Sequence, residues 1–306
     1  MPDGGDLPDL YSWTYTGRED DDVTVAKMEA HPAFPAACQA LARNMLAAAE
    51  ADKALNGIFI DAGRYAVAFL AIHLHLTGGL TLPRLKALTI GSGLSSPGRA
   101  RAVLLYLRYL GFITRGTRTP GEPDLFVLTP RCEEAWSAHL AAAVKSAAVI
   151  DPAIQPLVEA FGRAEVYRTF ATAHGSMLMS SFERMPMIDS PFFKSFLHRH
   201  AGSHILWTLI LAEENGTFPP RRTRPMSISD MSRRFGVSRP HVRRMFEASG
   251  RNGLLRRDGE AIVFEEGVRT FLSYLYATQL VWLVAAAART LEAHPQMQPP
   301  TTPYAR

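Results

Sequence analysis

The stretch 228–244, ISDMSRRFGVSRPHVRR, decides how the second half of this chain is expected to fold. Three apolar residues recur there at helical spacing and predict a short helix with one apolar face. These residues are Ile228, Met231 and Phe235. Gly236 permits a tight turn, and Ser238 is a preferred N-cap for a following helix. The stretch therefore predicts two helices joined by a sharp turn.

The second of these predicted helices carries basic side chains near its N-terminus. Val242 and Met245 are expected to face the core, which leaves five candidate DNA-contacting residues on the outside. They are Ser238, Arg239, His241, Arg243 and Arg244. A helix N-terminus favours anions, and arginine can pair bidentately with guanine or neutralise phosphate. This arrangement resembles the helix-turn-helix of bacterial regulators, in which that end of the second helix enters the major groove.

A short hairpin is expected directly after the helix pair. Leu254–Arg257 and Ala261–Phe264 have strand character, and Asp258-Gly259 is a turn signal between them. Two helices followed by a basic hairpin make a winged helix, whose wing lies along the DNA backbone or minor groove. Arg256 and Arg257 are therefore candidate DNA contacts on the first strand of the wing.

The same order of elements is expected once before in the chain. Ser95-Ser96-Pro97 corresponds to Ser238-Arg239-Pro240, and Gly111 corresponds to Gly253 at the start of each hairpin. The candidate contacts of this earlier unit are Ser96, Arg99, Arg101, Arg115 and Arg118. The fold class expected from this repeat is mainly α with small β-hairpins (α+β), built as two tandem winged helix-turn-helix domains with flanking long helices.

The chain divides into four expected regions. Residues 1–30 hold eight acidic and two basic residues and are expected to form an acidic disordered arm. The first winged-helix domain is expected over 31–150 and the second over 151–292. Residues 293–306 contain four prolines and are expected to form a Pro-rich tail.

Basic charge is concentrated in two blocks, although the whole chain of 306 residues has a formal charge of only +4. Residues 81–118 hold seven bases and no acid, and residues 221–257 hold eleven arginines against two acids. Such blocks are the electrostatic footprint expected for a phosphate backbone. The alternative is that they are solvated surface loops, or that the winged helices contact protein.

Each half also resembles one protomer of the MarR-type regulators. The resemblance covers about residues 31–292 and is carried mainly by 81–128 and 226–264. It implies that the chain is a fused pseudo-dimer that reads a two-fold DNA site as a monomer, or associates further as a homodimer. It also implies that the uncharged run 271–288 packs against the closing helix of the first half.

That run of eighteen uncharged residues is also long enough for the lower limit of a membrane-spanning helix. Burial between subunits or domains explains it equally, and no membrane association is expected. Two cysteines, Cys38 and Cys132, are too few for a disulfide framework. With no signal-peptide pattern at the N-terminus, the expected location is cytoplasmic.

No catalytic residue, cofactor or metal is expected, because no nucleophile–base set or paired carboxylates stand out. His198, His200 and His204 lie close together but lack a nearby acid or cysteine to complete a metal shell. The Met- and Phe-rich segment from Met177 to Phe196 is the expected site of a small apolar effector, with core filling as the alternative.

The sequence therefore predicts a non-enzymatic, sequence-specific transcription regulator that binds double-stranded DNA through two winged helix-turn-helix units. A plasmid-type replication initiator with tandem winged helices is the alternative, since it has about the same length. A winged-helix protein-interaction scaffold is a third hypothesis.

Overall fold

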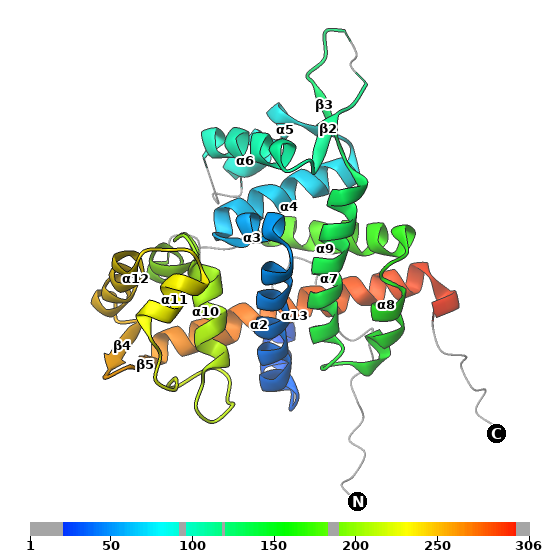
Figure 1. The fold of residues 1–306 in the computed structure, drawn as a ribbon. Coiled ribbons are helices and arrows are strands. Elements are labelled where there is room, and N and C mark those ends of the chain that lie inside the picture. Colours follow the sequence, from blue (N-terminus) through cyan, green and yellow to red (C-terminus); the bar gives the residue numbers. More distant parts are fainter. Residues whose placement is uncertain (1–20, 92–95, 118–119, 183–189, 298–306) are drawn as a thin grey trace, which may run out of the picture.

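The computed structural model describes residues 21–91, 96–117, 120–182 and 190–297, and over these ranges the chain is mainly helical. Its two small sheets are antiparallel, which agrees with the expected mainly α fold with small hairpins. Two lobes flank a central group of helices (Figure 1). The upper lobe belongs to the first half of the chain and the lower left lobe to the second.

The first half passes through leading helices into a helix pair, a hairpin and a long closing helix. Its elements are α1 (Asp21–Glu29), α2 (Phe34–Ala51), α3 (Lys53–Phe59), α4 (Ala62–Thr77), β1 (Leu80–Thr81), α5 (Leu82–Gly91), α6 (Pro97–Tyr109), β2 (Ile113–Arg115), β3 (Leu125–Leu128) and α7 (Pro130–Ala147).

The second half has a comparable order of elements. They are η2 (Pro152–Ile154), α8 (Gln155–Ala160), α9 (Ala164–Phe182), η4 (Phe193–Leu197), α10 (Gly202–Leu211), α11 (Ile228–Arg234), α12 (Arg239–Arg251), β4 (Leu255–Asp258), β5 (Ala261–Phe264), α13 (Glu266–Ala293) and η5 (Pro295–Met297).

Local sequence explains why the second helix of each pair begins with the same kind of cap and ends in the same kind of turn. The hydroxyl of Ser96 accepts from the backbone N–H of Arg99 at 3.2 Å, and Ser238 accepts from that of His241 at 3.2 Å. Each serine therefore caps its helix, with a proline in the first turn. After each helix the chain turns at Gly111 or Gly253, with φ of +72° and +64°, which glycine adopts without steric cost.

The sheets repeat this correspondence. In the first half the strand order is β1-β3-β2, with Leu80 opposite Phe126 and Ile113 opposite Leu128. In the second half β4 pairs with β5, and an isolated bridge joins Arg222 to Val263. The segment before α11 thus lies beside the second hairpin strand, as β1 does in the first half.

The two halves pack against each other reciprocally. Within each half the leading helix contacts the closing helix, α2 with α7 and α9 with α13. Across the halves α2 contacts α10, α9 contacts α4, and the two closing helices α7 and α13 meet. The buried residues form one continuous cluster from Val25 to Met297. The halves expected at 31–150 and 151–292 therefore share a core instead of burying two separate ones.

Helix α13 lies at the centre of this core. It contacts α1, α2, α7 and α9, and its residues from Leu280 to Ala288 are buried on all sides. By length and composition α13 could cross a membrane, and 78 % of its apolar window is buried within the structure. Helices α3 and α4 pass the same test only when joined across a bend of 111°. Burial by neighbouring helices accounts for the uncharged run 271–288.

Both ends of the described chain are more ordered than the sequence predicts. Part of the expected acidic arm forms α1, whose Val25 and Met28 are buried and which packs on α13. At the other end α13 continues to Ala293, and Met297 is buried after one further turn. The acidic composition of residues 1–30 gave no indication that Val25 and Met28 would be buried. The prolines of the tail likewise gave no indication that Met297 would be buried.

Candidate nucleic-acid interface

Helix α12 presents a row of arginines on its exposed side. Val242, Met245 and Phe246 are buried and fix the helix in its lobe, while Arg239, Arg243 and Arg244 are exposed. Among the described residues these three arginines form no ion pair, and Arg244 Nε donates only to the carbonyl of Pro240 at 3.3 Å. Exposed guanidinium groups without a carboxylate partner can bind phosphate or base edges without first breaking an ion pair.

Helix α11 supports α12 and ties the lobe to the helical core. Met231 is buried, and Gly236 has a φ of +64° at the turn into α12. The Arg234 guanidinium pairs with Glu50 of α2 through contacts of 2.7 and 3.1 Å. This bidentate pair links the helix pair to the first half of the chain.

The second hairpin adds basic side chains beside α12. Arg256 and Arg257 are exposed on β4. Arg256 Nε lies 3.4 Å from Glu265, and Arg257 donates to the carbonyl of Gly259 at 3.1 Å. An exposed ion pair contributes little to stability, so Arg256 can exchange its partner for a phosphate at small cost.

The first unit places its predicted residues less favourably. Ser96 and Arg101 are exposed, and Arg115 lies 3.4 Å from Asp124 across its hairpin, an exposed pair of the same kind as that of Arg256. Arg118 lies outside the described residues. The exposed side of α6 also carries Leu105 and Tyr109, which are 53 % and 85 % exposed.

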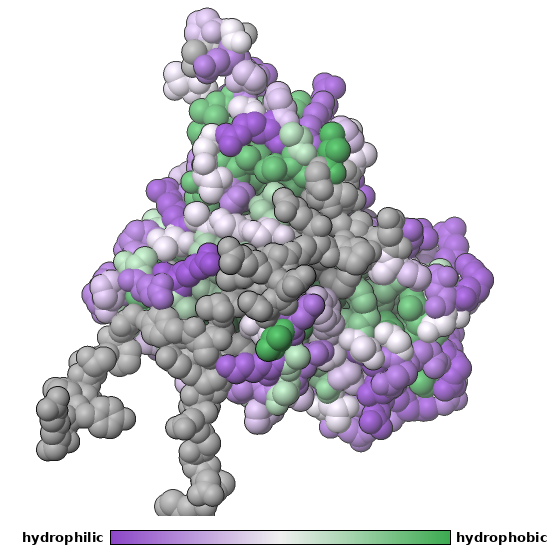
Figure 2. All heavy atoms as spheres, turned by 180° about the vertical axis from the view of Figure 1, so that it is seen from behind, coloured by the Kyte–Doolittle hydropathy of each residue, from purple (hydrophilic) through white to green (hydrophobic). Residues whose placement is uncertain are grey.

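Figure 2 shows the contrast between the lobes from behind. Hydrophobic surface appears between the hydrophilic residues of the upper lobe, whereas hydrophilic residues crowd the outer edge of the second unit's lobe at the right. Ile90 of α5, at 59 % exposure, belongs with Leu105 and Tyr109 to the large apolar residues exposed in the first unit.

Two predicted contacts, Arg99 and His241, differ from their expected outward orientation. Each is the third residue of its helix. The Arg99 guanidinium pairs with the buried carboxylate of Asp61, which also caps α4 by accepting from the N–H of Arg64. The Nε2 of His241 lies 2.9 Å from the carbonyl oxygen of His200 and donates to it.

These two contacts meet in one place, because the N–H of Ala201 donates to the carbonyl of Ile60 at 2.7 Å. We call residues 60–61 and 200–201, which immediately precede α4 and α10, the junction. The junction thus anchors the first turns of both α6 and α12. Asp61 could not be assigned this role from the sequence, where the only signal was that aspartate suits an N-cap.

Several residues of the segment expected to hold an apolar effector, 177–196, are buried within the protein. Met177 is buried in the core, Phe193 and Phe196 are buried in η4, and residues 183–189 lie outside the described ranges. His204 is buried beside Trp207, and the described residues contain no group of three or more potential metal ligands.

Comparison with protein-family models, curated proteins and solved structures finds no match to the chain.

Proposed function

We propose that the chain is a sequence-specific transcription regulator that binds double-stranded DNA through two winged helix-turn-helix units. The exposed arginines of α12, anchored by a buried apolar face and flanked by a basic hairpin, carry this proposal. They lie at the helix end that enters the major groove in this type of unit. No catalytic step is part of the proposal.

The order of elements supports two units of the same kind. Each half has a short strand or bridged segment, a helix pair with a serine cap, a hairpin and a closing helix. The reciprocal packing of leading and closing helices supports a single-chain pseudo-dimer similar to the MarR-type arrangement. The two units would then read neighbouring half-sites of an imperfect palindrome.

The test is selection of genomic fragments by the purified full-length chain, followed by footprinting of the bound site. Binding should survive competitor DNA at physiological salt and weaken steeply as salt increases, because several phosphate contacts release counterions. A site in a promoter supports the regulator. A footprint over origin repeats would instead indicate a replication initiator. If the chain binds none of the fragments, the protein-interaction scaffold is the hypothesis that remains.

A further inference from the structure

The helix pairs of the two units can be compared residue by residue, because Ser96 and Ser238 cap their second helices. The first residue after each cap begins α6 or α12, and both helices are 13 residues long. Their buried residues fall at the same positions. They are Ala100, Val103, Leu104 and Leu107 in α6 and Val242, Met245, Phe246 and Ser249 in α12. The same side of each helix is therefore turned away from the core.

The sides turned away from the core carry different side chains at corresponding positions. On a helix the ninth residue lies beside the fifth and the sixth, so these three positions form one surface, which we call the outer triplet. The outer triplets are Arg101, Ala102 and Leu105 in α6 and Arg243, Arg244 and Glu247 in α12, all of them exposed. Within the triplets only the arginine at the fifth position is common to both helices.

The outer triplet of α12 matches G·C base pairs. Guanine presents two acceptors in the major groove, N7 and O6, and one arginine guanidinium can bind both. Arg243 and Arg244 form no ion pair among the described residues, so their guanidinium groups are available. The carboxylate of Glu247 can accept from the N4 amino group of cytosine. All three side chains end in charged groups, which suit polar base edges.

The outer triplet of α6 matches thymine. Leu105, which is 53 % exposed, and Ala102 present aliphatic groups on the same face. The 5-methyl group of thymine is the one apolar group that the bases present in the major groove, and apolar side chains contact it there. Removing this methyl group from water favours the complex. Arg101 suits the phosphates on either side, and residues 81–118 contain no acid to repel them.

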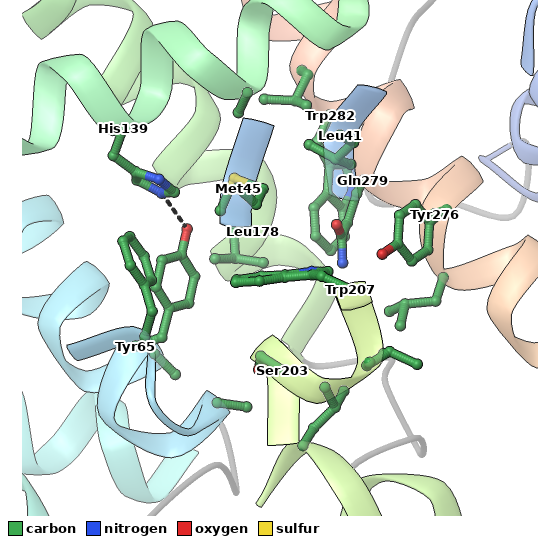
Figure 3. Close-up of a pocket in the computed structure, with 18 of the residues that line it drawn as sticks. Leu41, Met45, Tyr65, His139, Leu178, Ser203, Trp207, Tyr276, Gln279 and Trp282 are labelled. Atoms are coloured by element: carbon green, nitrogen blue, oxygen red, sulfur yellow. Dashed lines mark hydrogen bonds between the residues drawn. The ribbon is translucent and has the colours of Figure 1, made fainter. Parts of the chain in front are cut away.

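The two triplets are carried by one framework, because the two halves share a core. Tyr65 of α4 in the first half and Trp207 of α10 in the second line the same interior space, which Trp282 of α13 also borders (Figure 3). The hydrogen bond from the N–H of Ala201 to the carbonyl of Ile60 joins the segments that anchor α6 and α12. Each chain therefore presents one triplet of each kind.

We propose that the chain recognises a DNA site with two unlike half-sites. The half-site under α12 is read at guanines and cytosines, and the half-site under α6 is read at thymine methyl groups. Because both triplets lie on one polypeptide, the chain binds such a site in a single orientation. This inference rests on the proposed DNA-binding function, to which it adds the base content and the polarity of the site.

Base analogues in the footprinted site test the proposal without altering the chain. Uracil in place of thymine removes only the 5-methyl group, and 7-deazaguanine in place of guanine removes the N7 acceptor. Uracil at a contacted thymine in one half-site should weaken binding about fourfold, the effect of losing one buried methyl group. In the other half-site 7-deazaguanine should weaken binding about tenfold, as loss of a hydrogen bond to a charged group does. Fluorescence anisotropy measures both effects.

Two variants assign each half-site to its helix. In Leu105→Ala the uracil effect should fall below about twofold at one thymine, because the shortened side chain no longer reaches the methyl group. In Arg244→Ala the 7-deazaguanine effect should fall below about twofold at one guanine, because the donor to N7 is gone. Tyr109→Ala is the matched control for Leu105, because Tyr109 is 85 % exposed but is the last residue of α6, away from the end expected in the groove. It should leave the uracil effect unchanged.

A third variant should change the preferred base. Ala102→Arg gives α6 the residue that α12 has at the corresponding position. Ala102 is exposed, so the chain should stay folded by thermal melting. In selection from random DNA sequences, one position of the α6 half-site should change from thymine to guanine with a preference of about fivefold or more. The wild-type chain should select two unlike half-sites in the same experiment.

The inference is overturned if uracil has no effect, if uracil acts equally in both half-sites, or if the wild-type chain selects two like half-sites. An unchanged uracil effect in Leu105→Ala at every thymine overturns it as well. Each of these results leaves DNA binding, and so the proposed function, intact. If the chain binds neither genomic nor random DNA, the proposed function is overturned and this inference with it.

Discussion

The two helix–hairpin units are built on the same plan but present different surfaces. The exposed side of α12 carries Arg239, Arg243 and Arg244, whereas that of α6 carries Arg101 together with Leu105 and Tyr109. The serine cap, the glycine turn and the buried anchors are common to both. The shared residues specify the fold of a unit, and the exposed residues that differ specify what the unit can bind.

The two units also differ in how they are held at the junction. In the first unit a charged pair, Arg99 with Asp61, makes the connection. In the second a hydrogen bond joins the His241 ring to the backbone carbonyl of His200. The first anchor can be removed by changing the side chain at either end, whereas the second can be removed by a side-chain change only at His241, because its other end is a backbone carbonyl.

The largest expected effect is on DNA affinity in the second unit. The double variant Arg243→Ala, Arg244→Ala should weaken binding to the footprinted site about 100-fold, since each specific arginine contact contributes about 1–3 kcal/mol. Fluorescence anisotropy with labelled DNA measures this. Arg163→Ala is the control, because Arg163 is exposed but lies outside both basic blocks. Equal affinities for the double variant and the control would remove α12 from the interface.

The next effect is on the stability of the first unit's anchor. Asp61→Ala removes both the cap of α4 and the partner of Arg99, and should lower the free energy of unfolding by about 2–3 kcal/mol. Asp52→Ala is the matched control, because Asp52 caps α3 with its side chain. Its loss should cost about 1 kcal/mol. Urea unfolding of both variants measures the difference, and similar losses would mean that the Arg99 pair adds no stability.

A smaller effect on DNA affinity is expected in the first unit. Arg101→Ala should weaken binding about fivefold, because Arg101 is the exposed arginine in the first two turns of α6. Arg99→Ala should weaken it less than twofold, since Arg99 is occupied by Asp61. Anisotropy on the same DNA compares the two. A larger effect from Arg99 would show that its side chain leaves the junction on binding.

The smallest effect is expected from the wings. Arg256→Ala and Arg115→Ala should each weaken binding about threefold at physiological salt and reduce the slope of log affinity against log salt by about one, as loss of a single phosphate contact does. A salt titration of each variant measures both values. An unchanged slope for one variant would assign DNA contact to the other wing alone.

Local signals in the sequence were sufficient for the framework of each unit. Ser238 begins its helix as predicted, and Gly111 and Gly253 precede the hairpins. In the first unit Ser96 is the cap, so the expected correspondence of Ser95 with Ser238 is shifted by one residue. These features depend on a few neighbouring residues, so their physical cause is visible in the sequence.

The junction could not be predicted, because tertiary contacts impose it. The apolar run 193–213 predicts one helix, yet the structure breaks it at residues 198–201, where Ala201 has a φ of +62°. A Cβ on Gly202 would lie 1.8 Å from the carbonyl oxygen of Phe196, so the backbone crosses itself closely there. The bond from Ala201 to Ile60 joins residues distant in the sequence, and no local pattern encodes it.

The meeting of residues 60–61 with 200–201 has a consequence for how such a protein can change over generations. In a dimer of identical chains every substitution appears twice, and a contact on the two-fold axis must complement itself. Here an aspartate lies on one side of the contact and an alanine on the other, so each side can vary alone. The pair also stays assembled at any dilution, whereas a dimer separates as protomer concentration falls. A cell that contains a few copies of this chain therefore contains the same number of molecules with both lobes in place.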